Sequence, residues 1–226
     1  MLRDTNRFVA ISLNNLSRVL RRPGRLPEAE SVQREALALQ QEVLPAPHAE
    51  TANSLHNLGA LYRDQGKLAE AEAAHRQALA MLRQLFGDEH LAIASSLDVL
   101  ARVLCDEGKW VEAEGAARES LGIWEKKRPD DWRAFSARAV LGASLLGLKR
   151  YDEAGPSLPS GYAGMEQRLD KIAADYRTRV NETAVCLVQF YEATGRSDQA
   201  AEWKQKLEAL RQPAPATNSP VEAKPN

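Results

Sequence analysis

The chain has little of what marks a membrane protein, a nucleic-acid-binding protein or a disulfide-rich secreted domain. Of its 226 residues only two are cysteines and 6% are aromatic, and the formal net charge is −1. This balance favours neither nucleic acid nor an anionic membrane as a partner. No apolar run approaches the roughly 18 to 20 residues that a membrane-spanning helix needs. No hydrophobic signal stretch follows Met1, so we expect a cytoplasmic location.

Residues that could serve catalysis or bind a metal are also few. Cys105 and Cys186 lie far apart in the sequence and give no disulfide framework, so we expect ordinary, partly buried thiols. The histidines form no i, i+4 pair and have no cysteine at ligand spacing, which argues against a zinc site. They are His48, His56, His75 and His90. We expect His75 to pack between helices, and we predict no enzymatic activity, no metal and no cofactor.

A repeat is the most informative feature that the sequence does have. Gly24, Gly66 and Gly108 stand 42 residues apart, and each is followed by a basic residue and then by the triplet Glu-Ala-Glu. A fixed period of this length is typical of a tandem array, in which each unit buries its apolar face against the next. The six glutamates recur with the period, so we interpret them as structural residues near a helix start, where acidic side chains suit the helix dipole. They are Glu28, Glu30, Glu70, Glu72, Glu112 and Glu114.

The second copy shows the unit most clearly. Leu55, Leu58 and Tyr62 recur at helical spacing before Gly66, and a second amphipathic stretch follows and ends at Phe86. Gly87 suits the left-handed position after a helix, and Gly59 inside the first helix indicates a close approach between the two helices. The unit is therefore predicted to be two helices joined by a tight turn.

From Asp131 onward the pattern loosens and the spacing drops by one residue. Pro156 and Pro159 fall within the second helix of the fourth copy, so we expect that helix to be kinked or broken. We predict an all-α, α-α superhelix of about five helical hairpins over residues 1–211, the last two degenerate and the fifth acting as an end cap. The repeats are placed near 6–47, 48–89, 90–130, 131–175 and 176–211. The proline-rich segment 212–226 is predicted to be a disordered tail.

This unit resembles the tetratricopeptide repeat, through Leu55, Leu58-Gly59, Tyr62, Ala71 and Ala78. Its 42-residue length, with the segments 54–58, 62–67 and 85–90, is similar to the kinesin-light-chain variety of that repeat. The resemblance covers roughly residues 6 to 210 and implies a solenoid whose first helices line a concave groove. HEAT or armadillo repeats fit less well, because no proline-kinked first helix recurs.

A narrower resemblance concerns the C-terminal part. Residues 151–154, 161–165, 187–195 and 200–203 are similar to the repeat regions of bacterial serine/threonine protein kinases. The sequence carries no kinase-type Gly-rich loop, His-Arg-Asp triplet or Asp-Phe-Gly. An alternative function is therefore a regulatory or sensor module of such a kinase system, with the catalytic domain absent from this chain.

The favoured function is a non-catalytic scaffold that binds a peptide or protein segment in the groove. Amide and guanidinium groups dominate the positions beside the apolar set, which suits a segment with acidic residues or a C-terminal carboxylate. The candidate groove residues are Asn14, Asn15, Arg18, Arg22, Asn53, His56, Asn57, Arg63, Asp98 and Arg102. Farther along, Ala139, Val140, Ala143 and Val185 make the groove apolar.

Two alternatives to this interpretation stay open. The arginines can be a solvated face whose positive field is diluted by Asp64, Asp98 and Asp106. The chain can also self-associate through an uncapped first repeat, because repeat sequence begins almost at Met1. Neither a nucleic acid nor a membrane is expected as a partner.

Overall fold

The computed structural model describes residues 2–21 and 24–211, and within them all regular secondary structure is helical. The ten α-helices are α1 (Leu2–Leu20), α2 (Leu26–Val43), α3 (Ala49–Asp64), α4 (Leu68–Phe86), α5 (Leu91–Asp106), α6 (Trp110–Lys127), α7 (Trp132–Gly147), α8 (Tyr151–Glu166), α9 (Thr178–Ala193) and α10 (Ser197–Arg211). Two short 3-10 helices, η1 (Leu169–Lys171) and η2 (Ala174–Tyr176), connect α8 to α9. None of the helices in this described part is long and apolar enough to cross a membrane.

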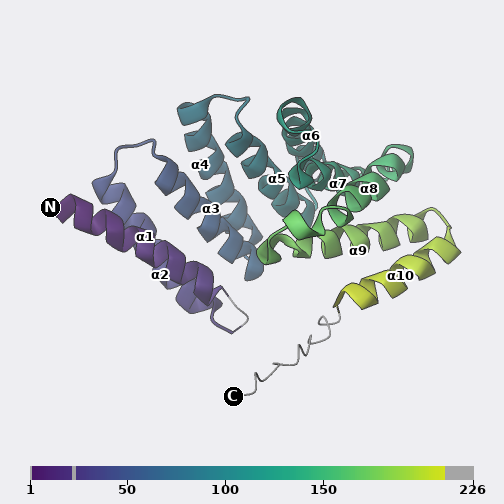
Figure 1. Ribbon diagram of the computed structural model, residues 1–226, viewed down its shortest axis with the longest axis horizontal. Coiled ribbons are helices and arrows are strands. Elements are labelled where there is room, and N and C mark those ends of the chain that lie inside the picture. Colours follow the sequence, from purple (N-terminus) through teal and green to yellow (C-terminus); the bar gives the residue numbers. More distant parts are fainter. Residues whose placement is uncertain (1, 22–23, 212–226) are drawn as a thin grey trace, which may run out of the picture.

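Consecutive helices pair into five hairpins that follow one another along the molecule (Figure 1). Each hairpin packs on the next through its second helix, as α2 does on α3 and α4 does on α5. The predicted all-α superhelix of about five hairpins is thus confirmed. The exact repeat limits stay a prediction, and the expected tail at 212–226 lies outside the described residues.

The three periodic glycines occupy equivalent bends. Gly24, Gly66 and Gly108 each stand between the two helices of a hairpin with φ of 88°, 75° and 75°. Glycine adopts this positive φ without the clash that a Cβ would cause. In the fourth hairpin Lys149 takes this place with φ of 60°, although it has a side chain. Gly87 also has a positive φ of 71°, but its ψ of 179° is extended and not left-handed helical.

Each hairpin contains a buried pair of residues sixteen positions apart, one on each helix. A Cβ added to Gly59 would lie 2.7 Å from Nε2 of His75, and one added to Gly142 would lie 2.7 Å from Cγ of Leu158. The five equivalent pairs are Ser17 and Gln33, Gly59 and His75, Ala101 and Ala117, Gly142 and Leu158, and Ala184 and Ala200. His75 therefore packs between helices as predicted, and a residue without a side chain stands opposite it because the ring fills the space.

Helix α8 corrects the prediction of a broken element. It runs without interruption from Tyr151 to Glu166 and contains both Pro156 and Pro159. Each proline removes one backbone donor and tends to bend a helix. Burial holds this one together, because Leu158 and Tyr162 are almost completely enclosed by α7 and its neighbours. The packing of one apolar face outweighs the two local breakers.

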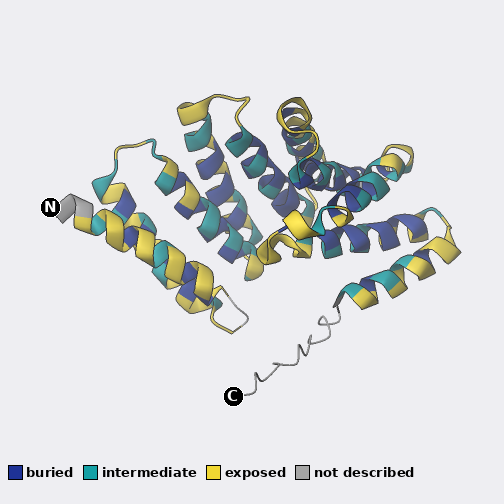
Figure 2. Ribbon diagram, viewed as in Figure 1, coloured by how far each residue is buried: buried dark blue, intermediate teal, exposed yellow. Residues whose placement is uncertain are grey.

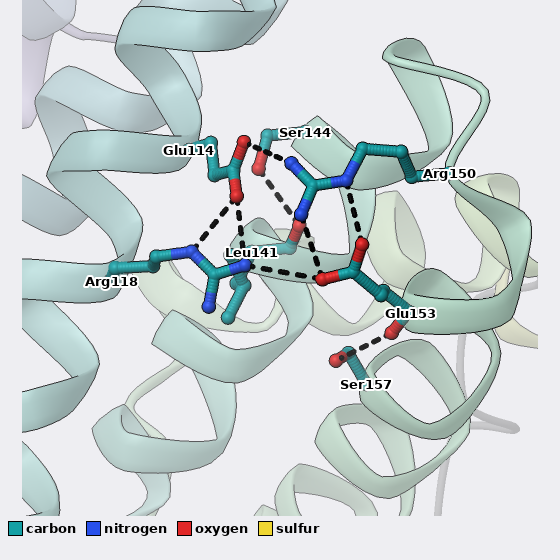
Figure 3. Close-up of polar contacts among 7 residues, drawn as sticks. All are labelled: Glu114, Arg118, Leu141, Ser144, Arg150, Glu153 and Ser157. Atoms are coloured by element: carbon teal, nitrogen blue, oxygen red, sulfur yellow. Dashed lines mark hydrogen bonds and ion pairs between the residues drawn. The ribbon is translucent and has the colours of Figure 1, made fainter.

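The last glutamate of each Glu-Ala-Glu triplet joins neighbouring repeats. Glu30, Glu72 and Glu114 each pair with the basic residue that follows the next turn, at 2.5 to 2.8 Å. The partners are Lys67, Lys109 and Arg150. Figure 3 shows the third of these sites, where Glu114 bonds Arg118 and Arg150 while Glu153 bonds the same two guanidinium groups. The basic residue and the triplet thus recur together because they form one ion pair between repeats, and the glycine forms the turn that precedes the basic residue.

Candidate functional site: a cavity on the inner surface

A cavity of about 490 Å³ opens on the inner surface of the second half of the array. First helices of four successive hairpins line it: α3, α5, α7 and α9. One wall is apolar and consists of Ala139, Val140, Ala143, Leu146 and Val185, with Trp110 of α6 at its edge. The four apolar positions expected in the fourth and fifth repeats therefore all line this cavity.

The polar side of the cavity holds two arginines that are already paired. Arg63 donates to Asp106 at 2.5 Å and to Glu182 at 3.2 Å, and Arg102 contacts the other oxygen of Glu182. Burial, together with the nearby charge of Arg179, lowers the pKa of Arg102 to about 9, so it stays protonated at neutral pH. Two positive and two negative groups thus balance on this side of the cavity.

Helix α9 reaches this site because its N-terminal end extends back along the inner surface. In Figure 1 that end lies beside the lower ends of α3 and α5. The contact of Glu182 with Arg63 joins α9 to α3, three hairpins apart along the chain. Arg179 of α9 also donates to Asp98 of α5 at 2.6 Å. The fifth repeat, through α9, therefore narrows the inner surface beside α3 and α5.

A smaller cavity of about 180 Å³ lies next to that anchor. Asp98 is buried there and accepts from Arg179 and from Ser136 of α7. The Arg179 guanidinium also lies 5.4 Å from the ring centre of Trp132 and 5.1 Å from that of Tyr176. A guanidinium that is paired, stacked and enclosed is costly to displace. The contacts of Arg179 beside this second cavity therefore hold α9 in place.

Both cysteines face the large cavity, although they stand in different repeats. They are free and partly buried, as predicted. Burial raises the pKa of Cys105 to about 12 and that of Cys186 to about 11, so both are neutral thiols at physiological pH. They add to the apolar lining and offer no reactive thiolate.

The structure brings together some of the predicted groove residues and separates others. Arg63 and Arg102 line the large cavity, whereas His56 and Asp98 line the small one. Five others line neither cavity: Asn14, Asn15, Arg18, Asn53 and Asn57. Arg22 lies outside the described residues. The side-chain oxygen of Asn14, Oδ1, is used internally, since it accepts from Gln33 at 2.5 Å and from Ser54 at 2.9 Å.

Sequence reasoning missed Glu182, Arg179 and the aromatic pair that flanks Arg179. Glu182 occupies the helical position of Asn57 once the one-residue shortening of the fourth repeat is allowed for, so the register could have identified it. No comparable signal exists for Arg179, because its contact with Asp98 depends on the angle at which α9 crosses the array. Among the described residues, no cluster of three or more histidine, cysteine or acidic side chains could hold a metal ion.

Comparison with known proteins decides the family. The tetratricopeptide repeat profile matches residues 8–84 and 50–126, which together span more than half of the chain. The chain is a tetratricopeptide repeat protein. Repeats of this family usually form non-catalytic scaffolds that bind proteins or peptides, which agrees with the function class expected from the sequence. No curated protein matches the sequence.

Several solved structures share the fold of this tetratricopeptide repeat protein. A kinesin-light-chain-like protein of Podosopora anserina with nearly identical TPR-like repeats is 21% identical, with a TM-score of 0.66 over 88% of this chain and 93% of that one. BtubC (BKLC) from P. vanneervenii is 20% identical, with a TM-score of 0.69 over 98% and 89%. The apo form of RapI is 17% identical, with a TM-score of 0.69 over 89% and 69%.

Such low identities show the fold alone. The solved structures support the structural similarity to kinesin-light-chain-like repeats that the 42-residue unit indicated. None of these three structures is a kinase, and the resemblance to kinase repeat regions stays a hypothesis.

Proposed function

We propose that this protein is a scaffold that holds a segment of another protein against its inner surface, with one apolar side chain of that segment seated in the large cavity. The observation that carries the proposal is the cavity itself, about 490 Å³ with an apolar wall, on the face formed by the first helices. Concave, mostly apolar sites with a few polar groups are the usual place for ligands.

The apolar wall supplies most of the affinity in this scheme. An exposed ion pair contributes about 0.2 to 1 kcal/mol, whereas micromolar binding needs about 8 kcal/mol. Burying a leucine- or phenylalanine-sized side chain contributes about 1.5 to 3 kcal/mol, and main-chain hydrogen bonds add to it. Val140 and Val185 are placed to contact such an anchor, because both line the cavity from facing helices.

The arginines give the site its preference for a carboxylate. Arg63 is about one quarter exposed and shares Glu182 with Arg102, so an incoming carboxylate can replace Glu182 at Arg63 without leaving the guanidinium unpaired. Charge-assisted, bidentate bonds of this kind are the strong ones. Toward the N-terminus the segment continues past Asn57, Asn53 and Asn15, whose amides suit an extended backbone.

Selection of peptides from a random library, followed by affinity measurement on variants, tests the proposal. Ala143→Trp places a large side chain in the cavity lining and is expected to abolish selection, whereas Val111→Trp, on an exposed residue of α6 outside the cavity, is expected to leave it intact. Arg63→Ala should weaken acidic peptides by about tenfold and amidated ones little. Equal peptide selection by wild type and Ala143→Trp would contradict the proposal.

A further inference from the structure

Helix α1 exposes an apolar face whose counterparts in later repeats are buried. Large hydrophobic side chains on this helix are 41% (Val9), 46% (Leu16) and 59% (Val19) exposed. The equivalent residues 42 positions later, Thr51, Leu58 and Leu61, are at most 6% exposed. The next copy repeats this, since Ile93, Leu100 and Val103 are all at most 3% exposed. The same three positions are thus covered wherever a hairpin stands before them.

In the second repeat the preceding hairpin covers two of these positions, Leu58 and Leu61. Leu61 packs in a cluster with Leu20, Leu26 and Val32 of the hairpin before it, and Leu37 packs against the cluster that contains Leu58. The covering element is therefore an amphipathic helix with apolar residues every three or four positions. In the described structure nothing covers the corresponding face of α1.

The face has a clear outline. Phe8, Val9, Ser12, Leu16 and Val19 lie on one side of the helix, as their spacing of three, four and seven residues requires. Phe8 is 69% exposed, and the Ser12 hydroxyl already bonds the carbonyl of Phe8. We call these five residues the α1 face. It carries no charged side chain, and exposed apolar stripes of this kind mark contact surfaces.

A further repeat packed on this face would lack one ion pair of the first interface. Between the first two repeats Arg7 pairs with Glu50 across the interface, and the residue of α1 equivalent to Glu50 is Phe8. The acceptor for such a pair is therefore missing. The opposite end of the array does not match either, because no large hydrophobic side chain on the described part of α9 or α10 is exposed. Lys204, Gln205 and Glu208 are exposed on α10 instead.

We propose that the α1 face is a dimerisation surface for a second copy of this chain, joined in a two-fold arrangement with the two α1 helices antiparallel. The uncharged face of one copy meets the identical face of the other, so apolar surface meets apolar surface without like-charge repulsion. A head-to-tail contact would place it against the polar α10 and leave the assembly open-ended, whereas the two-fold pair closes. The large cavity is lined by residues of α3, α5, α6, α7 and α9 and by none of α1, so it stays free in both copies and the proposal is independent of the anchor site.

Sedimentation of the full chain between about 1 and 100 µM tests the proposal. A concentration-dependent dimer is expected, and Leu16→Glu combined with Val19→Glu should weaken it at least about 30-fold. Val111→Glu serves as the control, because Val111 is 72% exposed but lies on α6. Circular dichroism must first show that each variant keeps its helix content. A monomer at every concentration would overturn the proposal.

Cross-linking identifies the geometry and does not depend on the stability of the glutamate variants. In a Cys105→Ser, Cys186→Ser background, Ser12→Cys alone should give a linked dimer with a short bis-maleimide. A linked dimer that forms only when Ser12→Cys is mixed with Gln205→Cys would show head-to-tail stacking and refute the two-fold pair. Binding of a helix from another protein to the α1 face, with the chain itself monomeric, would refute it as well.

Discussion

The pair Gly59 and His75 allows a quantitative test of how each hairpin closes. An alanine Cβ at position 59 would lie 2.7 Å from His75 Nε2, well inside ordinary contact distance. Alanine instead of glycine in a helix stabilises by about 0.5 to 1 kcal/mol, whereas overpacking a core costs about 1 to 3 kcal/mol. Gly59→Ala is therefore expected to destabilise the protein by about 1 kcal/mol.

A double variant at positions 59 and 75 shows whether the effects of the two single substitutions add. His75→Ala leaves a void and is expected to cost about 2 kcal/mol. Gly59→Ala with His75→Ala reproduces the natural pair Ala101 and Ala117 of the third hairpin, so the new methyl group enters the void. We expect a total loss of about 1 kcal/mol against the roughly 3 kcal/mol that simple addition gives, a coupling of about 2 kcal/mol.

Urea unfolding followed by circular dichroism measures these free energies, provided that the slope with urea is the same in all four proteins. Ala101→Gly supplies a matched control, since it removes a methyl group at the equivalent place in a hairpin without a ring. If the two single effects add within about 0.5 kcal/mol, the proposed closure of the hairpin is wrong.

Three further predictions concern the turns, the buried histidine and the contact between repeats. Lys149→Gly should raise the free energy of unfolding by about 1 kcal/mol, because Lys149 has a positive φ; an unchanged urea midpoint would count against this. Burial lowers the pKa of His75 to about 3, so the unfolded chain binds an extra proton below pH 6.5 and stability falls as pH decreases; from pH 7.5 to 5.5 this costs about 1.4 kcal/mol. His75→Leu, which copies Leu158, should remove that part of the pH dependence, and an identical pH profile would refute the assignment. Glu72→Gln should cost at most about 1 kcal/mol at low salt and less at high salt, because the ion pair with Lys109 is partly exposed; equal effects at both salt concentrations would contradict an ionic role.

The fold could be predicted from the sequence because the same pattern of turn and apolar residues occurs three times. Gly24, Gly66 and Gly108 mark turns that only a few residues can form, and the apolar spacing around them has a single helical solution. The role of the triplet glutamates was only half predicted. Their place near a helix start is visible in the sequence, but the pairing of Glu72 with Lys109 requires the stacking of two repeats.

Helix α8 shows why local signals fail in a packed array. Pro156 and Pro159 would end an isolated helix. In this protein α8 continues through both prolines, because Leu158 and Tyr162 are buried in the core. A prediction from local helix propensity counts the hydrogen bond that each proline removes, but it does not include the packing of α8 against neighbouring helices. In Figure 2 most of the buried, dark blue ribbon lies between α3 and α9, the part of the array that includes α8.

The candidate site was predicted in outline and not in detail. The resemblance to tetratricopeptide repeats implied that Arg63 and Arg102 lie on the inner surface together with the apolar positions that follow them, and the cavity contains them. The sequence could not show that Glu182 pairs with both arginines, because α9 crosses the array at an angle that no repeat rule specifies. A contact between the second and fifth hairpins is outside what a nearest-neighbour pattern describes.

The measurement that tests the central claim most directly is the methyl NMR spectrum of the chain during titration with a selected peptide. Val140 and Val185 line the cavity, whereas Val111 is exposed on α6 and Val19 on α1. If a protein segment binds in the cavity, the signals of Val140 and Val185 shift and saturate with the peptide while those of Val111 and Val19 stay in place. Shifts confined to Val111 or Val19 would contradict the account.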